Sequence, residues 1–408
     1  MVSPFPPNPC TLICPTRPAP SRALLVTTSS AYMSTSPLPE RSGWDDAYAR
    51  AWMSVAGCTP PVLRNTAYAD TSRRVLGGER GVIAQFCEGH LSTKRMTDLV
   101  APGGKVAAAP PPPAVRKPFD ASTFHFLKCR PAEQVLRVTL PTHAEDEHGA
   151  GGEAGEPSAD HRVWVNANPL WEGHGLFTPH VDRCQPQVMT PYYLLQVMRF
   201  TALSPSRDMF AGFNSLGAWA SVNHFHAHVG FLCDIFPSGL VPIAASPRKR
   251  VLQRDAEDGS FTLSLAIAKS WPSEPFVFSV EPKDTHQPST DAMLRALARV
   301  AGRFVAHLVD TDTAHTVMVM EGGTTVFVLA RAKQTWPGPA GGHMATALIE
   351  FTGVALVYSL AHFESVTAEE HAEVLSSAQL APEHLASLTT LASSLMSSSP
   401  EHDACSLA

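Results

Sequence analysis

The sequence predicts an α+β protein in which an antiparallel sheet is flanked by helices. Segments with the alternating pattern of strands and segments with helical spacing intermix along the chain without a βαβ rhythm, which argues against a parallel sheet. A Gly-Gly turn between two apolar runs indicates a β-hairpin. The chain has 408 residues, 44% of them apolar, so it is long enough to bury a sizeable core.

Each predicted element follows from a local pattern. Helical spacing of apolar residues first appears near Trp44. The turn Glu321-Gly322-Gly323 can adopt the positive φ of a hairpin, and Thr367 and Glu370 have the spacing of a capping box that opens a helix. We therefore predict strands at 136–140, 162–166, 261–268, 276–280, 316–320 and 324–329, helices at 191–203 and 290–309, and a strand–turn–strand unit across 208–236.

Four segments have compositions that predict loose structure. Residues 1–43 are rich in Ser, Thr and Pro and contain no acidic residue before Glu40, so they are predicted to be a disordered tail or a targeting peptide. A Pro/Ala/Gly-rich segment at 101–115 and an acidic Gly-rich segment at 143–160 are predicted to be loop insertions. The Ser-rich residues 391–408 are predicted to be a flexible tail. One catalytic region, 44–390, carries these insertions.

Composition argues against several classes of protein. The net charge of -6 disfavours a nucleic-acid surface, and no apolar run reaches the ~20 residues of a membrane span. The 8 cysteines include no C-x-x-C pair, which favours a reducing compartment over a zinc ribbon or a disulfide scaffold. We therefore expect a cytoplasmic protein, or a chloroplast protein if residues 1–39 are a transit peptide.

The most informative motif is His224-Phe225-His226-Ala227-His228. Alternate residues of a strand point to the same face, so three imidazoles are expected in a row, roughly 6.6 Å apart. Two chemistries use such a row. In nucleophilic catalysis, His226 attacks phosphorus while its neighbours hold its tautomer and donate protons. In metal binding, the same His-x-His spacing supplies zinc ligands.

The segment before the histidines has the composition of a phosphate site. It runs GFNSLGAWASVN over residues 212–223. Glycines such as Gly217 let a backbone approach a ligand closely, and Asn214 and Ser221 can donate hydrogen bonds to phosphate oxygens or to a ribose. Nucleotide binding is therefore the expected task of this segment.

The whole run GFNSLGAWASVNHFHAH resembles the signature of the GDP-L-galactose and GDP-D-glucose phosphorylases, a branch of the histidine-triad (HIT) superfamily. Other stretches resemble this family in order and type. They are QFCEGHLSTKR at 85–95, KPFDASTFHF at 117–126, NANPLWEGHGLFTP at 166–179 and, more weakly, residues 315–330 and 349–353. The resemblance covers roughly residues 80–380, with gaps at the two predicted insertions.

The resemblance implies a HIT-like antiparallel sheet and a ping-pong reaction that needs no cofactor. His226 would attack the α-phosphorus of a GDP-hexose and release hexose 1-phosphate, and inorganic phosphate would then release GDP. His224 would orient His226 or contact phosphate, and His228 would lie near the scissile oxygen. Asn214 and Ser221 match positions that hold nucleotide and phosphate. If the sugar is L-galactose, the reaction belongs to ascorbate biosynthesis.

Two positions depart from the family pattern. Plant GDP-L-galactose phosphorylases carry Gln where this chain has His228, as animal GDP-glucose phosphorylases and HIT hydrolases do, so the hexose stays open. Smaller HIT proteins carry Gln where this chain has Ala220, so Lys94 or Arg95 is predicted to supply a phosphate contact. His174, from the Gly-His pair that the family shares, is predicted to be a structural hydrogen-bonding residue.

Three other functions stay open at this point. A HIT hydrolase or adenylyl transferase would share the nucleophile and differ in substrate. A zinc-binding protein would use His224, His226 and His228 as ligands, whereas the preferred interpretation needs no metal. A catalytically silent interaction protein is the third. GDP-hexose and phosphate are the predicted partners, together with a second copy of the chain, because related folds pair through sheets.

The predicted core combines residues from the strands and helices above. Its members are Val165, Leu176, Phe177, Leu194, Leu195, Met198, Val222, Val229 and Phe231. The apolar face of the 290–309 helix, formed by Leu294, Leu297, Ala301, Phe304, Val305 and Leu308, completes it.

Overall fold

The computed structural model describes residues 41–66, 68, 71–87, 114–141, 160–284, 291–334 and 344–398. All of them belong to one compact unit, Thr35–Ala408. Within these ranges no helix is long and apolar enough to cross a membrane. Residues 1–40, nearly all of the two predicted insertions, and both Lys94 and Arg95 lie outside the described residues, so what was predicted for them stays a prediction.

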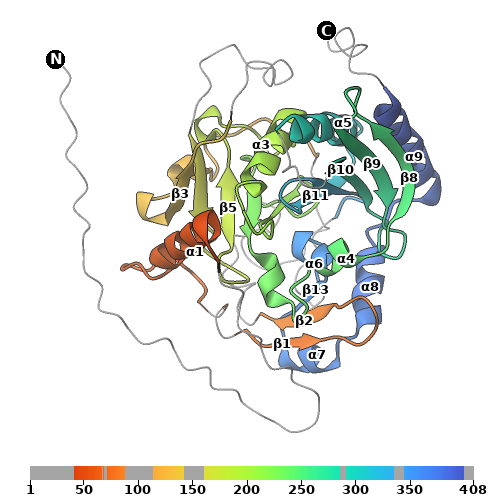
Figure 1. Cartoon of the computed structure of the whole chain (residues 1–408). Coiled ribbons are helices and arrows are strands. Elements are labelled where there is room, and N and C mark those ends of the chain that lie inside the picture. Colours follow the sequence, from red (N-terminus) through yellow and green to blue (C-terminus); the bar gives the residue numbers. More distant parts are fainter. Residues whose placement is uncertain are drawn as a thin grey trace, which may run out of the picture. The chain divides into compact units, whose positions relative to one another are not determined.

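A large antiparallel sheet forms the centre of the fold (Figure 1). It has 10 strands in the order β3-β4-β5-β7-β6-β11-β12-β10-β9-β8, and each neighbouring pair is antiparallel. The predicted α+β class with an antiparallel sheet is therefore confirmed. The strands are β3 Gln134–Val138, β4 His161–Val165, β5 Gly175–Thr178, β6 Phe210–Asn214, β7 Ala227–Gly230, β8 Lys249–Asp255, β9 Phe261–Ile267, β10 Phe276–Pro282, β11 Ala314–Met320 and β12 Thr325–Arg331.

The sheet consists of two halves with the same topology. Along the chain, β3, β4, β5, helix α3 (Pro191–Thr201), β6 and β7 are followed by β8, β9, β10, helix α5 (Asp291–Asp310), β11 and β12. In space, the order of the second half reverses that of the first about the central β6–β11 pair. Asn214 of β6 pairs with Thr316 of β11 at this junction. The fold is thus a tandem repeat, which the spacing of the sequence did not reveal.

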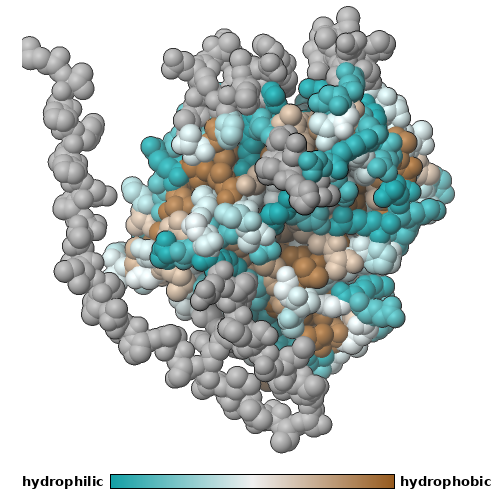
Figure 2. Space-filling view, in the orientation of Figure 1, coloured by the Kyte–Doolittle hydropathy of each residue, from teal (hydrophilic) through white to brown (hydrophobic). Residues whose placement is uncertain are grey.

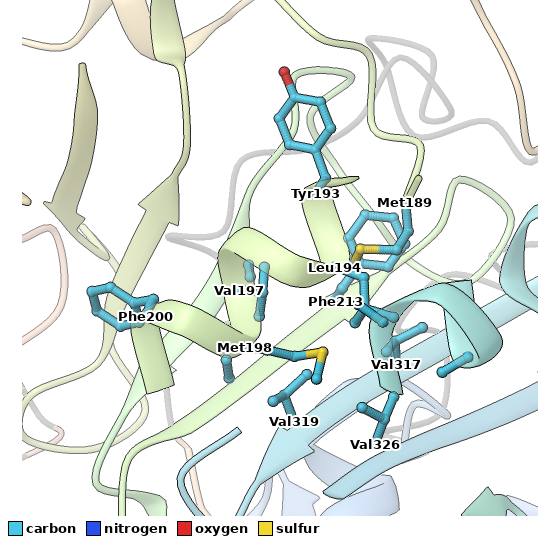
Figure 3. Packing of buried hydrophobic residues seen from close by; sticks show 14 of the residues in the cluster. Met189, Tyr193, Leu194, Val197, Met198, Phe200, Phe213, Val317, Val319 and Val326 are labelled. Atoms are coloured by element: carbon cyan, nitrogen blue, oxygen red, sulfur yellow. The ribbon is translucent and has the colours of Figure 1, made fainter. Parts of the chain in front are cut away.

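Helices cover one face of the sheet. Residues of α1 (Gly43–Ala56), α3, α5 and α9 (Pro382–Ser397) join alternate residues of the strands in one apolar core. Helix α3 begins where Thr190 accepts a hydrogen bond from the Tyr193 amide and a proline occupies the first turn. Figure 3 shows Met198 of this helix beside Val319 of β11, and both are buried. The long apolar face predicted for the second helix lies in this core.

A second apolar core lies on the opposite face, between the large sheet and the C-terminal segment. A small sheet, β1-β2-β13, is part of this layer, and its β2–β13 pair is parallel. Gly212 of β6 allows the close contact, because a Cβ there would lie 2.5 Å from the Leu348 side chain. The elements of the layer are β1 Arg73–Val75, β2 Ile83–Phe86, α4 Pro242–Ala245, α6 Leu348–Thr352, β13 Val354–Val357, α7 Leu360–Ser365 and α8 Ala368–Ser376.

Strand β8 forms one edge of the large sheet. Lys249 and Arg250 are exposed on it, and charged side chains at an edge discourage pairing with another sheet. In the orientation of Figure 1, Figure 2 shows mainly hydrophilic residues in the region of β8 and β9.

Three predictions need correction. Strand β7 begins only at Ala227, so His228 alone of the three histidines lies in a regular strand. Helix α9 extends to Ser397 with Met396 fully buried, so residues 391–397 are folded rather than part of a tail, because apolar residues at helical spacing pack onto the sheet. Leu176 and Val222 are only partly buried, because both line a pocket.

Candidate active site

A pocket of about 200 Å³ lies beside the first half of the sheet. Its walls come from three parts of the chain: the first half of the repeat, residues before β3 (Arg64 and several residues between 124 and 133), and residues 345–358 of the C-terminal layer. Four of the predicted site residues line it, namely His226, His228, Asn214 and Ser221. The other two described ones, His224 and Gly217, are not among its lining residues.

His226 presents one defined ring nitrogen to the pocket. Its Nδ1 lies 2.8 Å from the His224 carbonyl oxygen, which can only accept, so Nδ1 carries the proton. Nε2 is therefore the unprotonated nitrogen of the neutral ring. Burial lowers the pKa of His226 to about 4, and the hydrogen bond to the carbonyl opposes this only in part. The ring is thus a neutral nucleophile at pH 7, with its lone pair on Nε2.

Gln187 holds the backbone of His226, and no sequence pattern pointed to this residue. Its side-chain oxygen accepts from the His226 amide at 2.9 Å. Its side-chain nitrogen donates to the carbonyl oxygens of His226 at 3.1 Å and of Asn214 at 3.0 Å. The residue is 1% exposed. One amide side chain therefore fixes the spacing between the nucleophile and the predicted phosphate-binding asparagine.

His224 lies behind His226 rather than in the pocket. Its Nδ1 accepts a hydrogen bond from the Phe126 amide at 3.1 Å, and the side chain is 1% exposed. Burial, followed by the neighbouring His226 and His125 rings, lowers the pKa of His224 to about 4. The residue orients His226 through its backbone carbonyl, so of the two predicted roles only orientation fits this geometry.

His228 and His174 form a pair of coupled imidazoles. The Leu170 amide donates to Nδ1 of His174 at 3.2 Å, so the proton of this neutral ring resides on Nε2. That Nε2 lies 2.8 Å from Nδ1 of His228 and donates to it. The Asn166 amide nitrogen is farther from the same atom, at 3.2 Å. His228 is therefore protonated on Nε2, the opposite arrangement to His226, and the two rings lie 5.8 Å apart.

The partners of His174 define its position. Its ring stacks on Trp171 with centroids 3.7 Å apart and planes at 9°. The side chain is 1% exposed. His174 is a structural hydrogen-bonding residue, as predicted, and its partner is the catalytic candidate His228.

The segment between Asn214 and Ser221 is anchored by the second half of the repeat. The Thr316 hydroxyl donates to Oδ1 of Asn214 at 2.8 Å, which leaves the amide NH₂ of Asn214 as the group that can donate to a ligand. The side-chain oxygen of Gln334 accepts from the Trp219 indole at 2.5 Å, and the backbone N–H of Gln334 donates to the Gly217 carbonyl at 2.9 Å. Gly217 has φ +77°, so it serves the turn rather than the lining.

One end of the pocket is apolar and aromatic. Phe126 and Trp164 are buried in a small cluster there, packed against the partly buried Leu176 and Val222. Phe126 also contacts the His226 ring, with centroids 5.1 Å apart. A flat slot of this kind is suited to a planar base.

The described residues contain no group of three or more His, Cys, Asp and Glu side chains arranged to hold a metal ion. Nδ1 of His226 is bound to a carbonyl and Nδ1 of His224 accepts an amide proton. This geometry does not favour a shared zinc site on the three histidines.

Comparison with known proteins gives the family. A model for the N-terminal domain of GDPGP1-like proteins matches residues 65–230, and one for their C-terminal domain matches residues 247–399. This chain belongs to the GDPGP1-like family. The boundary between the two family domains falls between β7 and β8, which is also the boundary between the halves of the sheet.

Relatives of known activity cover part of the chain. GDP-D-glucose phosphorylase 1 of Danio rerio is 30% identical over 249 residues, which are 61% of this chain and 58% of that protein. Its human counterpart is 28% identical over 301 residues, 70% of each. GDP-L-galactose phosphorylase 2 of Arabidopsis thaliana is 30% identical over 167 residues, 40% of this chain and 36% of that protein. The match therefore spans between about one third and 70% of these relatives' own lengths.

Solved structures share the fold at low sequence identity. Yeast Ap4A phosphorylase Apa2 in complex with Ap4A superposes with a TM-score of 0.52 at 13% identity, covering 83% of this chain and 98% of that one. Its complex with AMP gives a TM-score of 0.51 at 11% identity. The predicted HIT-like fold is confirmed.

Proposed function

We propose that this protein is a GDP-hexose phosphorylase in which His226 carries the guanylyl group. The observation that carries the proposal is the pair of opposite tautomers in one pocket. His226 offers an unprotonated Nε2, while His228 is held protonated on the equivalent nitrogen by His174. A displacement at phosphorus is assisted by a nucleophile and by an N–H group that donates a hydrogen bond to the leaving oxygen.

The first half-reaction breaks the bond between the α-phosphorus and the bridging oxygen. Nε2 of His226 forms the new bond to phosphorus, and the electron pair of the broken bond stays on the oxygen of hexose 1-phosphate. The centroid of the His228 ring lies 5.8 Å from that of His226, and its Nε2–H donates a hydrogen bond that stabilises the charge on that oxygen, so hexose 1-phosphate leaves as the dianion. The Asn214 amide stabilises charge on the non-bridging oxygens.

In the second half-reaction, inorganic phosphate takes the place that hexose 1-phosphate has left. One of its oxygens attacks the guanylyl phosphorus, the bond to Nε2 breaks, and GDP leaves. His228 keeps its hydrogen bond to the bridging oxygen, and the proton of the attacking phosphate stays on the new β-phosphate or passes to solvent, which restores the starting state. The reaction needs no cofactor, and phosphate is the co-substrate.

The guanosine end of the pocket is assigned to the aromatic slot around Phe126 and Trp164. Glu133 lines the pocket as well, on the turn that follows Phe126 in the chain. A carboxylate can accept from N1–H and the 2-amino group of guanine, an edge that adenine lacks. Oε2 of Glu133 already accepts from the Arg130 backbone amide at 2.8 Å and Oε1 from the Arg130 guanidinium at 3.4 Å, so guanine would use the remaining lone pair of each oxygen. Guanine recognition is assigned to Glu133 on that basis.

Names of relatives support two sugars, D-glucose and L-galactose. His228 favours the D-glucose branch, since plant GDP-L-galactose phosphorylases have glutamine there. A role in ascorbate biosynthesis follows only if the sugar is L-galactose. We further predict that the protein is cytoplasmic and that it forms a homodimer. Size-exclusion chromatography with light scattering checks the homodimer.

Product analysis tests the proposal. The purified protein is incubated with GDP-D-glucose or GDP-L-galactose, with and without inorganic phosphate, and nucleotides are separated. GDP that appears only with phosphate supports phosphorolysis. GMP formed equally fast without phosphate identifies a hydrolase instead, and an absence of any nucleotide product from either sugar rejects the proposal.

A further inference from the structure

A second carboxylate, Glu350, lines the pocket on the side formed by the C-terminal layer. It lies on the short helix α6, and the residue is 1% exposed. Leu348 and Ile349 of the same helix, and Leu356 and Tyr358 beyond it, line the pocket too. The layer that packs against the second half of the repeat therefore also supplies one wall of the active site of the first half.

Helix α6 is held rigidly in place. The Trp271 indole donates to the Phe351 carbonyl at 3.0 Å, and Nε2 of His371 donates to the Glu350 carbonyl at 2.9 Å. Gly353 ends the helix at φ +111°, and Gly212 admits it against the sheet. A rigid helix gives the Glu350 carboxylate a fixed position, which a recognition residue needs.

Arg331 is a buried cation that offsets part of the free-energy cost of burying the Glu350 carboxylate. Arg331 is 0% exposed, donates to the Thr346 hydroxyl at 2.8 Å and lies over the Phe351 ring at 4.8 Å. Burial lowers the pKa of Arg331 to about 9, and the charge of Glu350 raises it in opposition. Arg331 is thus still charged at pH 7, and it lies near enough to Glu350 for the two charges to interact.

A carboxylate in this wall disfavours a phosphate group beside it, because like charges repel in a site of low dielectric constant. It favours hydroxyl groups, because an ionised carboxylate has only acceptor positions and binds two neighbouring O–H donors strongly. Tyr358 adds a hydroxyl next to it, and burial together with the Glu350 charge raises the pKa of Tyr358 well above its usual value. The tyrosine therefore stays protonated and can both donate and accept.

The position of this wall relative to the histidines fits the sugar. The aromatic slot contacts His226, whereas His228 lies toward Trp171 and the core of the C-terminal layer, through its partner His174. The leaving hexose 1-phosphate departs on the side of His228, which donates a hydrogen bond to the leaving oxygen. The sugar therefore extends toward the C-terminal wall.

We infer that Glu350, with Tyr358 beside it, recognises hydroxyl groups of the hexose and is the principal determinant of sugar specificity. This inference rests on the proposed function. It assigns the two carboxylates of the pocket to opposite ends of the substrate, Glu133 to guanine and Glu350 to the sugar.

The test compares two substrates that differ only in the sugar. GDP-hexose and the methyl ester of GDP share guanosine, the α-phosphorus and a phosphate-monoester leaving group. Glu350→Gln should lower kcat/KM for GDP-hexose by about 100-fold, the size expected for loss of a charged acceptor of two hydrogen bonds. The kcat/KM for the methyl ester should stay within about 3-fold of the wild-type value. Tyr358→Phe should act in the same direction by about 10-fold. Glu133→Gln is the matched control and should lower kcat/KM for both substrates by the same factor.

The possible failures are distinguishable. If Glu350→Gln lowers kcat/KM equally for both substrates, Glu350 has a structural role only. If it does not lower kcat/KM for GDP-hexose, the inference is rejected. If Glu350→Gln does not fold, as judged by circular dichroism, Tyr358→Phe decides by the same criterion. If the wild-type protein uses both substrates equally well, it has no sugar subsite; this result rejects the inference and leaves the proposed function standing. If the wild-type protein uses neither substrate, both the inference and the proposed function are rejected.

Discussion

Strands β7 and β12 occupy equivalent places in the two halves of the sheet, yet only β7 carries histidines toward a pocket. In β7, Ala227 and Val229 belong to the core under the helices. His226, just before the strand, and His228, within it, line the pocket on the opposite face. Because alternate residues of a strand point to opposite faces, one face of this segment packs in the core and the other presents the histidines to the pocket.

In β12 the same period separates one core from another. Val326 and Val328 belong to the core under the helices, and Phe327 and Leu329 belong to the core of the C-terminal layer. Apolar side chains and the C-terminal segment thus fill the side of the second half that corresponds to the pocket side of the first.

The comparison teaches that, among the described residues, the histidine-lined pocket belongs to the first half of the duplicated frame and that the second half acts as its scaffold. Thr316 and Gln334 of the second half orient Asn214 and the segment after it, and the C-terminal layer supplies Glu350. Four predictions follow from this division, from the largest effect to the smallest.

Removing the nucleophile should have the largest effect. His226→Asn is expected to lower kcat by about 10⁴-fold or more, because nothing else in the pocket forms the covalent intermediate. Phe327→Leu, a change in the equivalent strand of the second half, should leave kcat within about 3-fold. Steady-state release of GDP measures both. A comparable loss in the two variants would contradict the division of labour.

Truncating the equivalent strand should affect stability instead. Phe327 is 0% exposed, so Phe327→Ala is expected to lower the free energy of unfolding by about 3–5 kcal/mol through lost burial and a cavity. Urea denaturation followed by circular dichroism gives the value. A loss under about 1 kcal/mol would show that the C-terminal core does not depend on this strand.

His228→Ala should lower kcat by about 10²-fold, the size expected for the loss of one hydrogen-bond donor to the charge that develops on the leaving oxygen. His174→Ala should cause a smaller loss in kcat and alter the pH profile, since the tautomer of His228 is then no longer fixed. Activity measured across pH 5 to 9 separates these outcomes. Unchanged pH dependence in His174→Ala would reject the coupling of the two rings.

The smallest effect concerns acid stability. Burial lowers the pKa of His315, on β11, to about 4, below the unfolded value of about 6.5. The unfolded chain therefore takes up the proton first, so this contribution to stability is complete above pH 6.5 and is lost as the pH falls to about 4. His315→Asn should reduce the slope of unfolding free energy against pH in that window by up to about one proton. An unchanged slope would mean that His315 titrates normally.

His315 also explains why a depressed pKa does not identify a catalytic residue in this chain. Its pKa and that of His226 are both about 4, and burial is the main cause in both. His226 differs because its ring lines a pocket beside a proton donor.

The sequence predicted much of this architecture for physical reasons. Periodicity reports which side chains face a core, so the hairpin around Gly322 and the long helix α5 were predicted within a few residues. Local spacing also brought His226, His228 and Asn214 to the same pocket. The tail prediction failed at 391–397, because the serines of α9 occupy its exposed faces while Met396 is buried.

Contacts between distant segments could not be predicted. Gln187 lies 39 residues from His226 in the chain, and Thr316 lies 102 residues from Asn214. Only the folded sheet brings such pairs together, and an isolated Gln or Thr carries no signal of its own. Glu350 reaches the pocket in the same way, through the packing of α6 on Gly212.

Trapping of the intermediate tests the central claim most directly. GDP-hexose labelled with ³²P in the α-phosphate is mixed with the protein in phosphate-free buffer, and the digested protein is examined by mass spectrometry. The account predicts a guanylyl group on the peptide that contains His226, discharged as GDP when phosphate is added, and none in His226→Asn. Labelling of any other residue, or rapid turnover without protein-bound label, would contradict it.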